Sequence, residues 1–187
     1  MSEVSFTSAI RPVSSKQFNK FTADIVNNVN EWRAEGAKKG LSAKTDRILD
    51  CTALGITDGQ NVFLMHIIPE IGSNKHFFAK IIDKIKENID MSNEYLQALL
   101  VGSKNYSKES RMGYNNFAHF LKENKIPFSE LKGGDNAHKI AYHSKTDEWL
   151  VSNPDIDSLI QSGETNPKKL LDIGFDTVRI NKLDELV

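Results

Sequence analysis

A continuous apolar segment of strand length is the feature that most constrains the fold of this 187-residue chain. Residues 95–101 are almost wholly apolar, and Gly102 follows them at once. A short apolar run that ends at a turn residue is typical of a buried central strand. Two segments with apolar side chains at helical spacing lie on either side of it, over residues 75–89 and 108–124. We therefore expect a central strand in a sheet against which helices pack.

The other apolar patterns predict a set of short strands. Alternating apolar and polar residues, or a short apolar run between turn residues, are the expected patterns. They cover residues 45–54 and 61–68, a stretch near Ile126, a hairpin of 138–143 with 148–151, residues 175–180, and a strand or arm within residues 1–13. Residues 55–60, between the first two strands, are turn-like.

A further helix is predicted over about residues 14–34. Its apolar side chains recur three or four residues apart, at Phe18, Phe21, Ile25, Val29 and Trp32. Short helices are expected over 155–161 and 167–171. The order of all these elements predicts an α/β (α+β) protein, in which helices flank a mixed or largely antiparallel sheet or sandwich.

Composition and charge exclude some broad classes of function. The net charge of -1 argues against nucleic-acid binding as the main task, which needs concentrated Lys and Arg. No apolar stretch is long enough to span a bilayer, and the first residues lack the features of a signal peptide. One cysteine forms no internal disulfide, which fits a reducing compartment. We expect a cytoplasmic location in the producing cell, or delivery into a host cytosol by a specialised secretion machine.

The single cysteine and one histidine form the main candidate site. Cys51 lies in the first of the two predicted strands, and His66 follows fifteen residues later in the second. Two strands joined by a turn can bring a thiol and an imidazole side by side. A thiol becomes a strong nucleophile when it loses its proton, and an adjacent imidazole is the usual activator. The alternatives are that Cys51 is a small buried hydrophobe and that His66 is a satisfied core histidine.

The sequence predicts no metal and no cofactor. The other histidines show no metal-ligand spacing with the cysteine; they are His76, His119, His138 and His143. His138 and His143 are an odd number of residues apart, so they face opposite sides of one strand. Gly133-Gly134 has no P-loop lysine pattern beside it and is best explained as a hairpin turn.

Three local matches, taken in order, resemble a known family. Thr45 lies six residues before Cys51, and residues 65–69 (Met-His-Ile-Ile-Pro) form a short apolar block around the histidine that ends at a proline. The tract 96–151 adds the buried strand ending at Gly102, a helix with two adjacent asparagines, a Gly-Gly turn and a closing hairpin. Over about residues 44–152 this order resembles the CheD family of chemoreceptor glutamine deamidases. It is also similar to the catalytic domains of the cytotoxic necrotizing factor toxins.

The resemblance implies a CheD-like fold and a thiol-dependent protein glutamine deamidase. The family's nucleophile matches Cys51, its histidine matches His66, and its imidazole-orienting group matches Thr45. Residues 1–152 would form the catalytic domain with its extra helix over 14–34, and residues 153–187 an extension packed on it or mobile. The implied partner is a protein substrate with an accessible glutamine, and no cofactor is implied.

The residues before the cysteine depart from the family and keep other functions open. Leu49-Asp50 stands where the family usually has small residues, and a carboxylate that pointed inward there would oppose thiolate formation. Asp50 thus favours a non-catalytic binding module, and Thr45 is then an ordinary strand residue. A transglutaminase or related thiol acyltransferase would use the same site. The additional helix and tail favour a bacterial effector or toxin over a chemotaxis enzyme; substrate and oligomeric state stay open.

Overall fold

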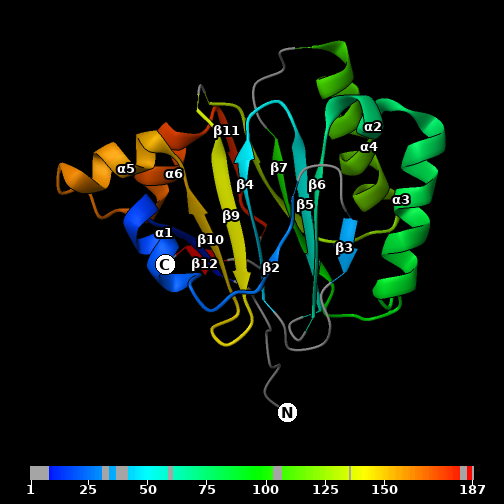
Figure 1. Ribbon diagram of the computed structural model, residues 1–187, viewed down its shortest axis with the longest axis horizontal. Helices are drawn as coiled ribbons and strands as arrows, with labels where there is room; N and C mark the ends of the chain where they lie inside the picture. The colour runs from blue at the N-terminus through cyan, green and yellow to red at the C-terminus, as the bar shows by residue number, and fades with distance from the viewer. Residues whose placement is uncertain are drawn as a thin grey trace.

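Two β-sheets packed face to face, with helices on both outer sides, form the body of the protein in a computed structural model (Figure 1). The structure describes residues 9–30, 34–36, 42–58, 61–102, 107–134, 136–181 and 185–186. Within these residues each sheet has six strands, and both sheets mix parallel and antiparallel pairs. The α/β (α+β) class with mixed sheets, predicted from the sequence, is therefore confirmed.

The first sheet has the strand order β12-β1-β10-β9-β4-β2. Its strands are β1 (Ala9–Pro12), β2 (Asn27–Asn28), β4 (Ala43–Ile48), β9 (His138–His143), β10 (Glu148–Ser152) and β12 (Glu185–Leu186). The predicted hairpin is present, because β9 and β10 pair antiparallel and β4 pairs antiparallel with the other edge of β9. β1 is parallel to both of its neighbours, β10 and β12, and the edge strand β2 is parallel to β4.

The second sheet has the strand order β11-β8-β7-β5-β6-β3. Its strands are β3 (Ala34–Gly36), β5 (Thr52–Thr57), β6 (Val62–Ile67), β7 (Gln97–Gly102), β8 (Phe128–Lys132) and β11 (Thr177–Arg179). All six residues of β7 are buried, and the strand lies between β5 and β8. The prediction of a buried central strand is confirmed.

The core between the sheets is built around a tryptophan. Trp149 of β10 is buried and packs against Tyr142 of β9, with ring centroids 5.0 Å apart and ring planes tilted by 54°. Its ring lies directly over Gly55 of β5, where an added Cβ would come within 2.0 Å of it. A side chain at Gly55 would therefore push the sheets apart. Apolar side chains of both sheets complete this core, and burial of each large one contributes roughly 1.5–3 kcal/mol.

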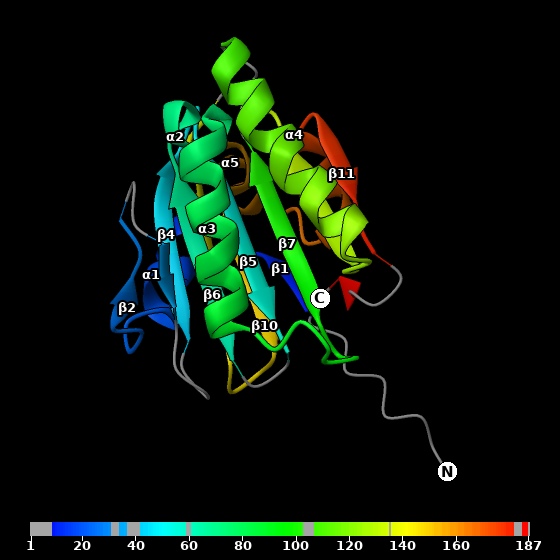
Figure 2. The same cartoon turned by 90° about the vertical axis from the view of Figure 1, so that its right-hand side faces the viewer.

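Helices on the outer face of the second sheet bury its other side. They are α2 (Pro69–Ser73), α3 (Lys75–Asn88) and α4 (Lys108–Glu123). Figure 2 shows α3 and α4 lying side by side across the sheet. Leu54, Phe63 and Met65 of the sheet pack with Ile85 of α3 and Phe117 of α4. The side chains of β5 and β6 thus alternate between this layer and the core between the sheets.

The outer face of the first sheet is covered by α1 (Ser15–Phe21), whose Phe18 packs on Ala141 and Leu150. The tail contributes α5 (Pro154–Gln161) and α6 (Pro167–Gly174). Ile156, Leu171 and Phe175 of the tail enter the core between the sheets, and β11 pairs with β8. The described part of residues 153–187 therefore packs against both sheets.

Two predicted elements are wrong in extent. The helix expected over residues 14–34 ends at Phe21, and the following Thr22 turns its hydroxyl back onto the Phe18 carbonyl at 2.9 Å. Ile25 and Val29 are buried, but they lie in non-helical chain around β2. Apolar residues three or four positions apart therefore do not require a helix, because Ile25 and Val29 reach the core from a non-helical segment. Trp32 lies outside the described residues.

The strand expected over residues 45–54 is two strands in different sheets. β4 ends at Ile48 in the first sheet, and β5 begins at Thr52 in the second. Residues 55–57, expected in a turn, continue β5. The glycine at position 55 makes room for the Trp149 ring and does not mark a turn. The short helix α2 was not predicted. Across the described part of the chain, no helix combines the length and apolar character needed to cross a membrane.

Candidate functional site

The three predicted site residues come from both sheets. Thr45 lies in β4 of the first sheet, His66 lies in β6 of the second, and Cys51 lies directly before β5. Their exposed fractions are 1%, 1% and 4%, so all three are buried. Residues 49–51 form a three-residue link that carries the chain from one sheet to the other. This sheet-crossing link is the local structure that positions the cysteine.

Strand pairing holds both ends of the link. On one side Ile48 pairs with His138, after a register shift that follows Thr45. Arg47, within that shift, has a φ of 57°, a left-handed conformation that costs about 1 kcal/mol or more in a residue other than glycine. On the other side Thr52 pairs with residues of β6 and β7 at once. The position of Cys51 is therefore set by two sheets.

Cys51 and His66 face the same side of the second sheet. Ala53 lies directly opposite His66 in the antiparallel pair of β5 and β6. Cys51 lies one residue before β5, outside this paired register. Cys51 and Ala53 both belong to the core between the sheets, whereas Leu54 belongs to the helix layer. His66 and Cys51 therefore both face the core between the sheets, near the end of the second sheet where β5 begins.

A hydrogen bond between the two sheets joins Thr45 to His66. The Thr45 Oγ1 atom lies 2.8 Å from the Nδ1 atom of the histidine ring. The same hydroxyl lies 2.8 Å from the main-chain carbonyl of Val29, which can only accept. Since a hydroxyl has one proton, Thr45 donates to Val29 and accepts from His66.

This chain of bonds determines the tautomer of the histidine. With the proton on Nδ1, the lone pair of the neutral ring is on Nε2, which is itself buried. Nε2 is then the nitrogen able to take a proton from a thiol. An orienting partner on one ring nitrogen with the base on the other is the arrangement required of a general base beside a nucleophile.

A carboxylate next to the cysteine acts against thiolate formation. The Cys51 thiol donates to Asp50 Oδ1 over 3.6 Å. A negative charge at this distance stabilises the protonated thiol. The side chain of Asp50 is exposed, so water screens much of its charge. The carboxylate therefore contacts the thiol directly while Asp50 stays exposed to water, and its charge opposes loss of the thiol proton.

The first turn of α4, in the helix layer on the second sheet, makes a hydrogen bond to the sheet-crossing link. Ser107 caps the helix, and the buried Ser110 donates its hydroxyl to the main-chain carbonyl of Asp50 at 2.8 Å. In Figure 1, α4 begins at the upper end of the sheets, where β4 ends. Sequence reasoning missed Ser110. No local pattern predicts that a helix serine bonds a carbonyl sixty residues earlier.

A second buried histidine lies beside the link but is held differently. His138 of β9 donates from Nε2 to the Gly133 carbonyl at 2.7 Å, and its Nδ1 accepts from the Asn153 amide at 3.2 Å. Its ring packs on Phe175 with centroids 4.4 Å apart. Burial lowers the pKa of His138 to about 4, although the Gly133 carbonyl acts in the opposite direction. The ring is therefore neutral near pH 7, and both of its nitrogens make hydrogen bonds within the fold.

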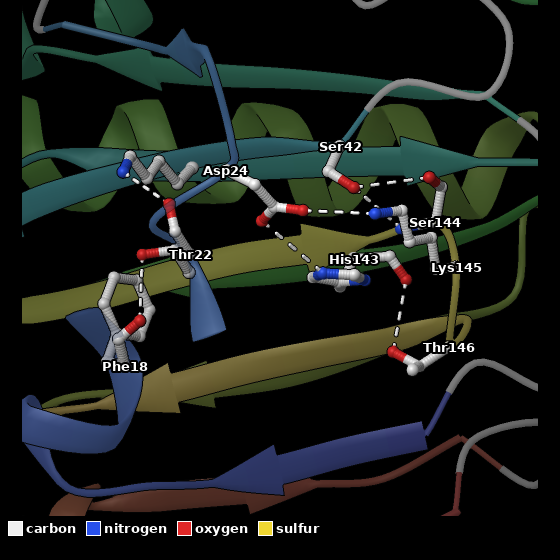
Figure 3. Close-up of polar contacts among 9 residues, drawn as sticks. Phe18, Thr22, Asp24, Ser42, His143, Ser144, Lys145 and Thr146 are labelled. Atoms are coloured by element: carbon white, nitrogen blue, oxygen red, sulfur yellow. Dashed lines mark hydrogen bonds and ion pairs between the residues drawn. The ribbon is translucent and has the colours of Figure 1, made fainter. Parts of the chain in front are cut away.

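A polar cluster at the other end of β9 is separate from the site (Figure 3). Asp24 lies 3.2 Å from Lys145 and 3.9 Å from His143, and Ser42 bonds the hydroxyl and main chain of Ser144. The bond with Lys145 lowers the pKa of Asp24. These contacts fasten the chain after α1 to the β9–β10 hairpin. Nothing in them connects to Cys51.

The fold and site define a two-sheet α+β protein with a threonine, a histidine and a cysteine in one buried region. Neither the known protein-family models nor the curated proteins match this chain. In the part of the chain that the structure describes, no three His, Cys, Asp or Glu side chains gather as a metal site would require.

Proposed function

We propose that this protein is a cysteine-dependent protein glutamine deamidase of the CheD-like and cytotoxic necrotizing factor-like type. The observation that carries the proposal is the hydrogen bond from His66 Nδ1 to Thr45 Oγ1. It leaves Nε2 as the basic nitrogen, on the sheet face that Cys51 shares. The order Thr45, Cys51 and His66 is also the order of the matching positions in the resembled family.

The reaction follows from these roles. His66 Nε2 takes the thiol proton of Cys51, and the sulfur attacks the carboxamide carbon of a glutamine side chain. The imidazolium returns a proton to the departing ammonia, which leaves a thioester on Cys51. His66 then takes a proton from water, and the hydroxide formed hydrolyses the thioester. The net change is conversion of glutamine and water to glutamate and ammonia, with the thiol regenerated.

The orienting group is weaker than the carboxylate of a serine hydrolase, but a thiol needs less activation. A thiol of ordinary pKa already carries a few per cent thiolate at pH 7. A neutral hydroxyl that fixes the tautomer of His66 is therefore sufficient support. Thr45 is suited to this because its own proton is committed to Val29.

The substrate class is a folded protein with an accessible glutamine, and the proposed setting is a bacterial effector or toxin acting in a host cytosol. The tail supports this setting, because α5, α6 and β11 lie outside the tract that resembles CheD yet are built into the fold. A chemoreceptor deamidase is the corresponding chemotaxis alternative.

A non-catalytic binding module is the second candidate, favoured by the contact of the Cys51 thiol with Asp50. One experiment separates the candidates. Purified protein, Cys51→Ala and His66→Ala are incubated with a cell lysate, and Gln-to-Glu conversion is mapped by mass spectrometry together with ammonia release. Conversion by the parent alone supports the deamidase, and equal results for all three proteins contradict it. Incorporation of an added primary amine in place of water would identify a transglutaminase.

A further inference from the structure

The peptide bond before Cys51 is held by a side chain from outside the link. Ser110 Oγ lies 2.8 Å from the main-chain oxygen of Asp50, and Ser110 itself is 5% exposed. In a trans peptide the carbonyl and the following N–H point in opposite directions. No cis peptide occurs among the described residues. Fixing the Asp50 carbonyl therefore also fixes the direction of the Cys51 N–H.

The hydroxyl of Ser110 is used in an unusual way for its position. The start of α4 is already capped, because Ser107 Oγ accepts from the Ser110 main-chain N–H at 3.0 Å. A serine hydroxyl in a first helical turn usually bonds nearby backbone of its own helix. Here it leaves the helix and bonds the one peptide that precedes the cysteine. The bond thus adds a third fixed point to a link that strand pairing holds only at its ends.

We propose that Ser110 is a positioning residue, which orients the Cys51 N–H toward the oxygen of the attacked carboxamide. This inference rests on the proposed deamidase function. When sulfur attacks the carbonyl carbon, the C=O double bond becomes a single bond and its oxygen gains negative charge. The N–H of the nucleophilic residue is placed to donate to that oxygen, and a preorganised donor stabilises the transition state more than the ground state. Ser110 keeps this donor from turning away.

The test compares two reactions of the same sulfur in the full-length protein. Acylation by p-nitrophenyl acetate forms a thioester and releases p-nitrophenolate, and it passes through an oxyanion. Alkylation by iodoacetamide displaces iodide at a saturated carbon and forms no oxyanion. Both are measured in single turnover for the parent and for Ser110→Ala, with Cys51→Ala as the background. Ser158→Ala is the matched control, because Ser158 also donates to a carbonyl from a helix, at 2.9 Å, but in α5.

Ser110→Ala is expected to slow acylation by about 10- to 100-fold, as a misdirected oxyanion donor would. Its alkylation rate stays that of the parent, and Ser158→Ala changes neither reaction. Equal losses in both reactions would show that Ser110 acts on the thiol or the fold, and no loss would show that it is not needed; either result overturns the inference. Acylation of the parent no faster than of Cys51→Ala would instead contradict the deamidase function.

Discussion

Two buried histidines flank the link that carries Cys51, and they differ in what holds the ring. Both ring nitrogens of His138 make hydrogen bonds, one to a main-chain carbonyl and the other from a side-chain amide. His66 has its Nδ1 bound to a hydroxyl from the opposite sheet and lies on the face of the cysteine. Both are almost fully buried, at 0% and 1% exposed.

Burial alone therefore does not distinguish a structural histidine from one proposed to act as a base. Both rings have a defined tautomer, because each has a partner that can only accept or only donate. In His138 the basic nitrogen is Nδ1, and an amide hydrogen occupies it. In His66 the basic nitrogen is Nε2, on the ring edge away from Thr45. A histidine is suited to act as a base when its orienting hydrogen bond is made by the protonated nitrogen and not by the nitrogen that carries the lone pair.

The largest expected effect is that of His66→Ala on the chemistry of Cys51. Loss of the base should slow acylation by p-nitrophenyl acetate about 10²- to 10⁴-fold near neutral pH. The control is His119→Ala on α4, which removes an exposed histidine paired with Glu123 at 3.0 Å. If the two variants acylate at the same rate, the proposed role of His66 is wrong.

His138→Ala should produce the opposite pattern. Its removal leaves the Gly133 carbonyl and the Asn153 amide without the ring and opens a cavity beside Phe175. We expect the free energy of unfolding to fall by about 2–4 kcal/mol in urea titrations. The alkylation rate of Cys51 in the folded variant should stay that of the parent. An alkylation loss without loss of stability would reverse the roles assigned to the two histidines.

Lowering the pH should decrease the stability of the folded protein because of His138. Its pKa is about 4 in the folded protein and ordinarily 6.5, so between these values the unfolded chain binds more protons. The contribution is complete above about pH 6.5 and is lost as the pH falls toward 4, with an upper limit of roughly 3 kcal/mol. Urea titrations of the parent and His138→Ala at pH 7 and pH 5 measure it. A pH dependence of equal size in both proteins would contradict this assignment.

Thr45→Val should give the smallest effect. The variant keeps the shape of the side chain but removes the hydroxyl that orients His66. We expect acylation of Cys51 to slow about tenfold, equivalent to about 1.4 kcal/mol in the transition state. Thr57→Val is the matched control, because Thr57 is an equally buried threonine near the far end of β5. An unchanged rate in Thr45→Val would show that the ring needs no orienting partner.

Much of the fold was predictable, because strongly patterned segments form the elements their patterns indicate. The apolar run of β7, the helical spacing of α3 and α4, and the β9–β10 hairpin are examples. The break at residues 49–51 was not predictable, since both sheets share one core and the apolar pattern continues across it. Helical spacing also failed at Ile25 and Val29, which reach the core from extended chain.

The site was predictable in its residue types but not in its contacts. The order of Thr45, Cys51 and His66 is visible in the sequence, and only a family resemblance assigns the threonine a role. The hydrogen bond that the Thr45 hydroxyl donates to the Val29 carbonyl depends on packing between distant segments. The support from Ser110 depends on the same kind of long-range contact. Such bonds join residues whose proximity no local pattern records.

The proposed role of His66 as the base for Cys51 is tested by the pH dependence of Cys51 alkylation by iodoacetamide, in the parent and in His66→Ala. We expect the parent to react faster than a model thiol near neutral pH, because His66 takes the thiol proton, with a rate that falls at acidic pH. In His66→Ala that advantage is lost, and the rate rises only near the pKa of an ordinary thiol. Identical profiles for the two proteins, both no faster than the model thiol, would show that Cys51 is an inert buried cysteine.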